Sequence, residues 1–398
     1  MIYVRLLLLS SFLSLATSGA VAGQQITAVS LPDDGAIEAM GNDLFLETAS
    51  TGMVLVVVRG RETYFHAYGE TAPGSHQLPD QDSVLRLCSL TKIFTTDLLT
   101  KLVADKTVRF DDPLQKFAPK NRPVPKRVKQ ITLLDLATHT SGLPRELGTA
   151  PSPIPHFTFP DYSTRWLWLP NQHLRSVPGT TALYSNIAFD FLADAMQGAT
   201  HRQYAALLSE RTLIPLHMWS TTYFPTPEQC GRLLSSAHDE RACAETEATD
   251  GSSGLYSTSR DMVIWLKYLL GVDTPAIPGQ DATAQAIYIR PADLLKQRGL
   301  DHAGEPTGVG LGWIHILPID SPSTIVEKTG GGAGFETYIA LSRAAKTGIF
   351  VAATGGAIET HVNLFNAANK MLLAFAGLPP LPPPLKPLVK HRHAQRRR

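Results

Sequence analysis

The chain has 398 residues, enough to bury a sizeable core in one large domain or two smaller ones. With 43% hydrophobic and 18% charged residues it has the composition of a globular protein, which argues against a disordered or fibrous chain. The formal net charge of +1 is unevenly placed, because six basic residues and no acid follow residue 376. Removing these six and Arg5 leaves the remainder near −6, so a basic nucleic-acid-binding face is not expected and no nucleic-acid partner is predicted.

The first 22 residues have the pattern of a secretory signal peptide. Arg5 supplies the positive end, residues 6–16 are apolar or small, and Ala20-Val21-Ala22 is a cleavage pattern. The alternative is an uncleaved anchor helix, which the short length of the apolar run disfavours. We therefore expect an exported protein whose mature chain starts near Gly23.

Strands are expected near both ends of the chain, with helices between them. Residues 52–58 and 62–68 are β-rich and predict a hairpin with its turn at Arg59-Gly60. Helical spacing of apolar residues predicts four helices, at 90–104, 186–196, 259–270 and 360–376. Strand signals return late in the chain, at 311–317, 324–328, 336–341 and 348–353.

This order of elements predicts a single catalytic domain over residues 23–376 of the α/β (α+β) class. One antiparallel sheet would combine residues about 35–90 with about 300–376 and be flanked by helices. Residues about 105–300 would form a mostly helical insertion. The cleft between sheet and insertion is the natural place for an active site.

The last residues, 377–398, are proline-rich and then basic, which predicts a disordered tail. Two interpretations stay open for it: a solvated extension, or a peripheral contact with anionic membrane lipid or cell-wall polymer. Cys230 and Cys243 lie close together in a polar stretch and would pair as a disulfide in the oxidising compartment that export implies. Cys88 lies in an apolar run and is predicted to be a small buried residue.

The first motif with catalytic character is Ser89-Leu90-Thr91-Lys92. If the helix begins at Ser89, Lys92 lies one turn later on the same face and places an amine beside a hydroxyl. A lysine whose pKa is lowered by burial or by another cation can take the proton of a serine nucleophile. The helix N-terminus also favours negative charge near the serine. An S-x-x-K sequence arises by chance roughly once in such a chain, so it needs partners.

The second motif is Tyr184-Ser185-Asn186. A phenol near two ammonium groups can shuttle protons, because the cations stabilise the phenolate. Asn186 can bind the lysine and a substrate amide together. Taken alone, the same three residues also fit a helix start with a capping serine and a packed tyrosine.

The third motif is Lys328-Thr329-Gly330, which is followed by Gly331. The lysine and threonine side chains can hold a substrate carboxylate, and the glycines let a substrate backbone lie along the strand edge. A second K-T-G, at Lys346, falls between two predicted strands and is expected to form a hairpin turn.

In this order the three motifs resemble those of the serine β-lactamase and penicillin-binding protein superfamily. The Y-S-N sequence resembles class C β-lactamases and low-molecular-mass D-alanyl-D-alanine carboxypeptidases. Framework segments that begin at Thr138, Gly254 and Gly310 also resemble this superfamily, and the resemblance spans residues 35–375. The resemblance is strongest to D-alanyl-D-alanine carboxypeptidases/endopeptidases.

The resemblance implies a β-lactamase/transpeptidase-like fold and a serine hydrolase. The enzyme would lie in the periplasm, where it could associate with the inner membrane. Ser89 would be the nucleophile, with Lys92 and Tyr184 as its catalytic partners. The substrates would be peptidoglycan stem peptides, and β-lactams such as penicillin would acylate the serine. The implied substrate-binding residues are Asn186, Lys328, Thr329, Gly330 and Gly331, with the backbone N–H groups of Ser89 and Gly331 as oxyanion donors.

Two alternatives remain beside this reading: a class C-like β-lactamase or related esterase, and a non-catalytic protein that binds β-lactams or cell wall. No G-x-S-x-G sequence occurs, which argues against an α/β-hydrolase. The chain has no H-E-x-x-H, paired C-x-x-C or phosphate-loop sequence, so no metal or cofactor is expected. His139 is predicted to be structural.

Overall fold

The computed structural model describes residues 31–381 apart from 123, 125–127, 149–157, 237–241, 274–281, 301–302, 317–320 and 356–360. The predicted signal peptide and most of the predicted tail therefore lie outside the described residues. Leu378 and Leu381, at the start of the predicted tail, pack against the apolar core. Within the described residues, no helix is long and apolar enough to cross a membrane.

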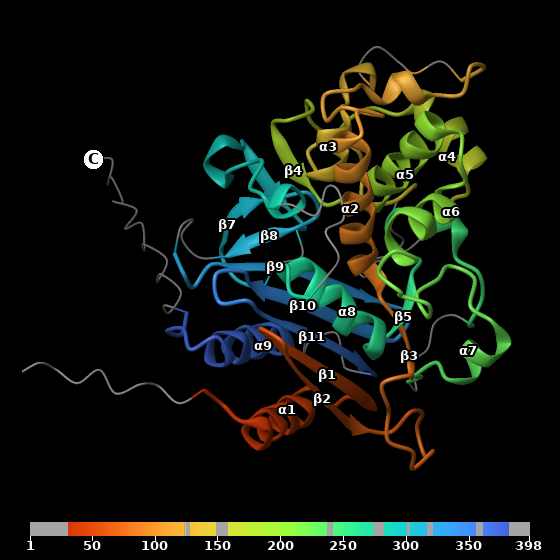
Figure 1. Ribbon diagram of the computed structural model, residues 1–398. Helices are drawn as coiled ribbons and strands as arrows, with labels where there is room; N and C mark the ends of the chain where they lie inside the picture. The colour runs from red at the N-terminus through yellow and green to blue at the C-terminus, as the bar shows by residue number, and fades with distance from the viewer. Residues whose placement is uncertain are drawn as a thin grey trace, which may run out of the picture. The chain divides into compact units, whose positions relative to one another are not determined.

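Seven strands form one antiparallel sheet in the order β2-β1-β11-β10-β9-β8-β7 (Figure 1). The two ends of the chain meet where β1 pairs with β11, which confirms the predicted sheet. The strands are β1 (Gly52–Arg59), β2 (Glu62–Gly69), β7 (Pro306–Val309), β8 (Ile314–Ile316), β9 (Ile325–Gly332), β10 (Phe335–Ser342) and β11 (Thr347–Thr354).

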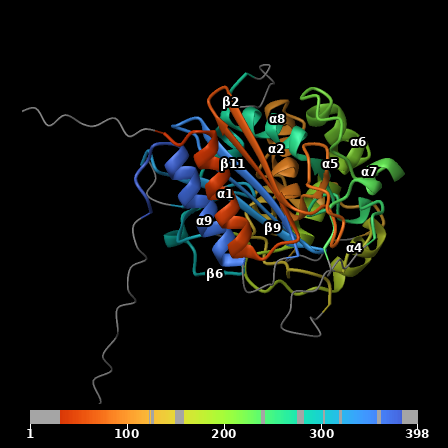
Figure 2. The ribbon, with the colours of Figure 1, turned by 90° about the horizontal axis from the view of Figure 1, so that it is seen from below.

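Strand β1 is buried on both faces, which explains its nearly continuous run of valines. Alternate residues enter two separate cores, because side chains of a strand point to opposite faces. Val56 belongs to the core shared with the helical part, and Val57 to the core beneath α1 (Asp34–Thr48) and α9 (His361–Phe375). Figure 2 shows α1 and α9 side by side on one face of the sheet. On the other face α8 (Ser259–Leu270) packs against β1 and β11.

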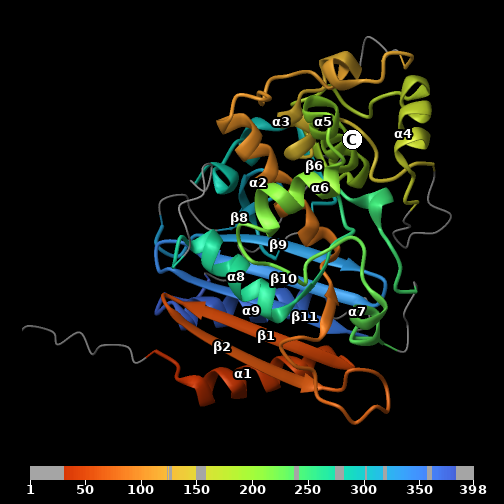
Figure 3. The ribbon, with the colours of Figure 1, turned by 45° about the vertical axis from the view of Figure 1, so that its right-hand side comes forward.

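The rest of the chain is mostly helical, as expected, and gathers beside β9 (Figure 3). Its central element is α2, which is buried along most of its length. Its helices are α2 (Thr91–Ala104), α3 (Leu133–Ala137), α4 (Tyr162–Trp168), α5 (Asn186–Thr200), α6 (Tyr204–Leu208) and α7 (Pro227–Gly231). Two short strand pairs were not predicted: β3 (Val84–Arg86) with β5 (Tyr256–Thr258), and β4 (Thr181–Leu183) with β6 (Lys296–Arg298).

Several boundaries differ from the sequence prediction for local reasons. Arg59 pairs with Glu62, so the first hairpin turn is Gly60-Arg61, one residue later than predicted, and Gly60 takes a φ of 57° that suits glycine. The strand expected at 311–317 is only Ile314–Ile316. Strand β9 continues to Gly332 despite its glycines, because β10 pairs with it along that whole length.

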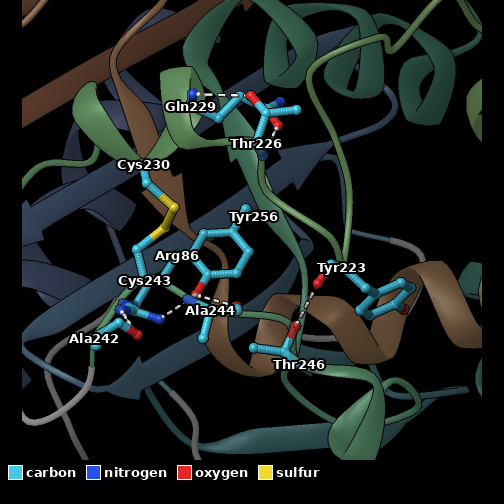
Figure 4. The surroundings of a disulfide bond; sticks show 10 residues. All are labelled: Arg86, Tyr223, Thr226, Gln229, Cys230, Ala242, Cys243, Ala244, Thr246 and Tyr256. Atoms are coloured by element: carbon cyan, nitrogen blue, oxygen red, sulfur yellow. Dashed lines mark hydrogen bonds between the residues drawn. A yellow bond between two sulfur atoms is a disulfide. The ribbon is translucent and has the colours of Figure 1, made fainter.

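The structure links Cys230, in α7, to Cys243 by a disulfide with a Cα–Cα distance of 5.7 Å (Figure 4). Arg86 holds the same region to the short strands. Its guanidinium donates to the Tyr256 hydroxyl at 2.7 Å and to the Ala242 carbonyl at 3.1 Å. The disulfide loop is thereby attached to β3, the strand that leads into the first catalytic motif.

Candidate active site

Ser89 lies in a 3₁₀ turn, Cys88–Leu90, between β3 and α2. The helix itself begins at Thr91, so Ser89 precedes it rather than opening it. Cys88 has a φ of 50°, an unusual conformation for a non-glycine residue that reverses the chain direction here. Its thiol contacts the Gly332 carbonyl of β9 at 3.4 Å. Burial raises the pKa of this thiol to about 12, so Cys88 is an unreactive structural residue.

The Lys92 side chain is fully buried and its Nζ atom has acceptors on several sides. Nζ lies 3.1 Å from Ser89 Oγ, 2.7 Å from Asn186 Oδ1 and 2.8 Å from the Ser252 carbonyl oxygen. The two carbonyl oxygens accept from Nζ, whereas the Ser89 hydroxyl can either donate to it or accept from it. Lys92 therefore joins the first two sequence motifs and a loop that the sequence did not indicate.

Tyr184 follows β4 and is only 4% exposed. Its hydroxyl lies 2.7 Å from Ser89 Oγ. Lys92 Nζ, Lys328 Nζ and the Arg145 guanidinium lie 4.9, 5.3 and 4.7 Å from the centroid of its ring. Basic side chains this close to the ring would stabilise negative charge on the phenol oxygen.

Ser185 fixes where α5 begins, directly after Tyr184. Its hydroxyl accepts from the Ala188 N–H at 3.0 Å and donates to the Pro144 carbonyl at 2.6 Å. Ser185 therefore caps α5, as considered from the sequence, while its neighbours Tyr184 and Asn186 face Ser89 and Lys92. The cap places Asn186 in the first turn of α5, with its amide oxygen toward Lys92.

Lys328, Thr329 and Gly330 lie within β9 rather than after it. Strand β8 pairs with β9 only as far as Glu327, so the following residues form a strand edge on that side among the described residues. A Cβ atom on Gly330 would lie 2.3 Å from Thr337 Oγ1 and 2.9 Å from the Leu87 carbonyl, so glycine is required for β9 to approach the Ser89 segment.

Thr329 Oγ1 is buried and has no hydrogen-bond partner among the described residues. A buried hydroxyl without a partner is costly, which suits a group that binds a ligand. The second K-T-G does not join the site. Lys346 lies in the turn between β10 and β11, as predicted, and its Nζ donates to the Leu270 carbonyl at 2.6 Å.

Glu146 is a buried residue of the site that sequence reasoning missed. One carboxylate oxygen accepts a short hydrogen bond from Asn186 Nδ2, and the other accepts from the Thr158 hydroxyl at 3.1 Å. The carboxylate thereby fixes which end of the Asn186 amide faces Lys92. The only signal in the sequence was an acidic residue next to the framework loop that ends at Pro144.

His139 supports Tyr184 from behind, in keeping with the structural role predicted for it. Its ring stacks on Tyr184 with centroids 4.5 Å apart, and its Nδ1 atom accepts from the Ser185 N–H at 3.2 Å. Burial, assisted by the charges of Lys92 and Lys328, lowers the pKa of His139 well below its usual range. The imidazole is therefore neutral and adds no charge to the site.

Helix α5 carries a stripe of polar residues behind the site, at Asn186, Asp190 and Asp194, one helical turn apart. Burial raises the pKa of Asp190 to about 7. Arg165 of α4 holds Asp194 through two bonds, of 2.6 and 3.1 Å, and so anchors α4 to α5. Among the described residues, no group of His, Cys, Asp and Glu side chains is placed to bind a metal ion.

Comparisons with known proteins agree with this geometry. The Beta-lactamase family model matches residues 35–365. D-alanyl-D-alanine-carboxypeptidase/endopeptidase AmpH of Escherichia coli K12 is 38% identical over 379 residues, covering 95% of this chain and 98% of that protein. The crystal structure of a beta-lactamase/D-alanine carboxypeptidase from Yersinia pestis complexed with citrate superposes with a TM-score of 0.80 and 37% identity, covering 87% of this chain and 100% of that one. A class C beta lactamase from Rhodobacter sphaeroides, 22% identical, shares the fold with a TM-score of 0.67, covering 83% and 97%.

The neutral His139 predicts a dependence of stability on pH. An imidazole with a lowered pKa stays neutral in the folded protein but takes up a proton in the unfolded chain below about pH 6.5, so its contribution to stability falls with pH. We expect the wild type to lose more free energy of unfolding between pH 7.5 and 5.0 than His139→Gln. Urea unfolding at both pH values measures this, and equal losses would contradict the assignment.

The hydrogen bond between Asn186 and Glu146 leads to a prediction about the rate at which Ser89 is acylated. Glu146→Ala frees the Asn186 amide to rotate, and we expect acylation of Ser89 by benzylpenicillin to slow about tenfold, the effect of losing one hydrogen bond. Glu146→Gln keeps an acceptor oxygen and is the matched control, with an intermediate rate. Intact mass followed over time gives the rates. Acylation of Glu146→Ala at the wild-type rate would show that the amide needs no such support.

Proposed function

The chain belongs to the beta-lactamase family, and from that premise we propose that it is a serine-type D-alanyl-D-alanine carboxypeptidase and endopeptidase acting on peptidoglycan stem peptides. The observation that carries this proposal is the position of Ser89 Oγ, within 3.1 Å of Lys92 Nζ and 2.7 Å of Tyr184 Oη. The identity with the AmpH carboxypeptidase/endopeptidase along nearly the whole chain supports the substrate class.

The first step is removal of the Ser89 proton. The sequence suggested a neutral Lys92 that works with Tyr184. We propose instead that Lys92 is an ammonium ion, the ordinary form of lysine, which donates to Asn186 Oδ1 and the Ser252 carbonyl and has no lone pair to offer. Tyr184, surrounded by three cations, is the better base: its phenolate takes the Ser89 proton while Lys92 stabilises the negative charge on both oxygens.

Ser89 Oγ then attacks the carbonyl carbon between two D-residues, and a C–O bond forms. Backbone N–H groups of Ser89 and Gly331 would bind the oxyanion, each such donor being worth about 3 kcal/mol. Lys328 and Thr329 would hold the carboxylate next to the scissile amide, since Lys328 supplies the charge and the Thr329 hydroxyl has no other partner among the described residues.

Collapse of the tetrahedral intermediate breaks the C–N bond, and Tyr184 returns its proton to the leaving amine. Water then attacks the ester carbonyl, Tyr184 accepts the water proton and passes it to Ser89 Oγ, and the acid product leaves. A terminal D-alanine and the D-centre of a cross-linking diamino acid both carry a carboxylate beside the amide. One site can therefore perform carboxypeptidase and endopeptidase cleavage.

We expect benzylpenicillin to form a long-lived adduct on Ser89 that increases the mass of the intact protein. Ser89→Ala should show no adduct and no release of D-alanine, because it removes the one atom that contacts both Lys92 Nζ and the Tyr184 hydroxyl in the described hydrogen bonds. The two K-T-G sequences supply a matched pair: Lys328→Ala should slow acylation about a hundredfold, and Lys346→Ala should remain within about twofold of the wild type.

The outcomes of this measurement separate the alternatives. An unmodified wild type that consumes penicillin would mean fast deacylation, and hence a β-lactamase. An unmodified wild type with intact penicillin would indicate a binding protein without catalysis. D-alanine release by Ser89→Ala would refute the assignment of the nucleophile.

Export to the periplasm is part of the same proposal and rests on the N-terminal sequence. N-terminal sequencing of protein from the periplasmic fraction should give a chain that starts near Gly23, and a chain that starts at Met1 would contradict it. If the basic tail 377–398 contacts anionic lipid or cell wall, high salt should release the mature protein from the envelope fraction.

A further inference from the structure

A pocket of about 450 Å³ opens beside Tyr184, and its charged lining is entirely positive. It shares Tyr184 and Arg145 with the site described above. The charged residues that line it are Arg145, Arg175, Lys296 and Arg298. We call this the cationic pocket.

One wall of the cationic pocket is the parallel strand pair β4 and β6. Lys296 lies opposite Thr181 in the register and Arg298 lies opposite Leu183, and all four residues line the pocket. Residues two apart on a strand share a face, so both cations project from the same side of this pair. The Tyr184 N–H donates to the Arg298 carbonyl at 3.2 Å, which fixes this wall relative to the catalytic phenol.

The other wall is held by backbone contacts to the site loops. The Asn186 N–H donates to the Arg145 carbonyl at 3.0 Å, and the Arg145 guanidinium lies 4.7 Å from the Tyr184 ring centroid. The Arg175 N–H donates to the Gly142 carbonyl at 2.8 Å. A Cβ atom at Gly142 would lie 2.4 Å from the Ser176 carbonyl, so the two segments are in close contact. Backbone hydrogen bonds therefore fix both walls of the pocket relative to Tyr184 and Asn186.

Three of the four cations that line the pocket have no ion-pair partner in the described part of the chain. The side chains of Arg175, Lys296 and Arg298 are exposed, and none of them forms an ion pair with a described residue. Like charges around one pocket repel each other, and a bound anion would remove this repulsion. The chain away from this region and the tail is acidic overall, so the cluster is not a consequence of composition.

The position of the pocket indicates which part of a substrate it receives. Tyr184 protonates the leaving amine in the proposed mechanism, so a pocket lined by Tyr184 lies on the leaving-group side. Lys328 and Thr329 already account for the single carboxylate of a D-alanine leaving group. A leaving peptide in endopeptidase cleavage extends beyond these two residues and carries further carboxylates.

We propose that the cationic pocket binds carboxylates of the leaving peptide and so favours cross-linked, acidic substrates in the endopeptidase reaction. This inference rests on the proposed function and specifies its substrate. Arg and Lys side chains suit carboxylate recognition, and charges exposed at the mouth of a pocket act mainly by attraction that salt screens.

The test compares two cross-linked peptide dimers. In one, the leaving peptide keeps all its carboxylates; in the other, every carboxylate is amidated except the one beside the scissile bond. We expect the wild type to cleave the acidic dimer with a kcat/KM about tenfold higher, and the double variant R175Q/K296Q to lose most of this preference. Raising the salt concentration should reduce the wild-type preference in the same direction.

Lys370→Gln is the matched control, since Lys370 is an exposed cation on α9, on the far face of the sheet. It removes one positive charge and should keep the wild-type preference. Arg298→Gln is a second, single variant that leaves the backbone bond to Tyr184 in place. Equal cleavage of the two dimers by the wild type, or an unchanged preference in R175Q/K296Q, would overturn the proposal while leaving the proposed function intact.

A binding measurement tests recognition by the cationic pocket separately from catalysis. With Ser89→Ala, calorimetry should show that the acidic dimer binds about tenfold more tightly than its amidated analogue, and that R175Q/K296Q removes the difference. If the wild type releases no D-alanine and cleaves neither dimer, the proposed function fails, and this binding difference still decides whether the pocket recognises carboxylates. Equal binding of both dimers would overturn the pocket assignment independently of catalysis.

Discussion

The buried amine of Lys92 is the constraint on which the rest of the site depends. A buried polar group without partners is costly, so the elements around it must present oxygens. Helix α2 supplies the lysine, α5 supplies the Asn186 amide oxygen, and a loop supplies the Ser252 carbonyl. The same bonds that satisfy this amine place Ser89 Oγ beside it, so the packing of the helical part and the geometry of the site are one arrangement.

Charge is distributed unevenly around this centre, and the distribution matches the chemistry. Lys92, Lys328 and Arg145 surround the Tyr184 ring, where negative charge develops when the serine is deprotonated. The compensating acid, Glu146, contacts Asn186 rather than Tyr184, and His139 remains neutral against the ring. Basic side chains thus lie against the phenol ring, while the Glu146 carboxylate bonds to the amide that contacts Lys92.

The sequence predicted the parts of the fold and site that depend on local order. The terminal strands, the helices α2, α5, α8 and α9 and the three motifs are each encoded within a few neighbouring residues, so periodicity and spacing were sufficient, whereas helix α1 was not predicted. Glu146 could not be found in this way, because only the fold brings it to Asn186. The short strands β4 and β6 could not be found either, because three-residue pairs have too little pattern and are stabilised by their distant partner. The basic side chains around Tyr184 also needed the structure, since Arg145 and Lys328 reach its ring only through the fold.

The two K-T-G sequences show why context decides function. Both follow strand-like stretches, yet Lys328 lies within β9 at an edge beside the nucleophile, whereas Lys346 lies in a hairpin turn and bonds to the end of α8. The difference arises because the pairing of β8 with β9 ends at Glu327. The rest of β9 is thereby left accessible to a substrate backbone. The cationic pocket lies beside Tyr184, and its cations Arg175, Lys296 and Arg298 take no part in the proposed proton transfer. Substitutions there can change which leaving peptide is accepted without altering the chemistry at Ser89, so specificity and catalysis occupy separate walls of one cleft.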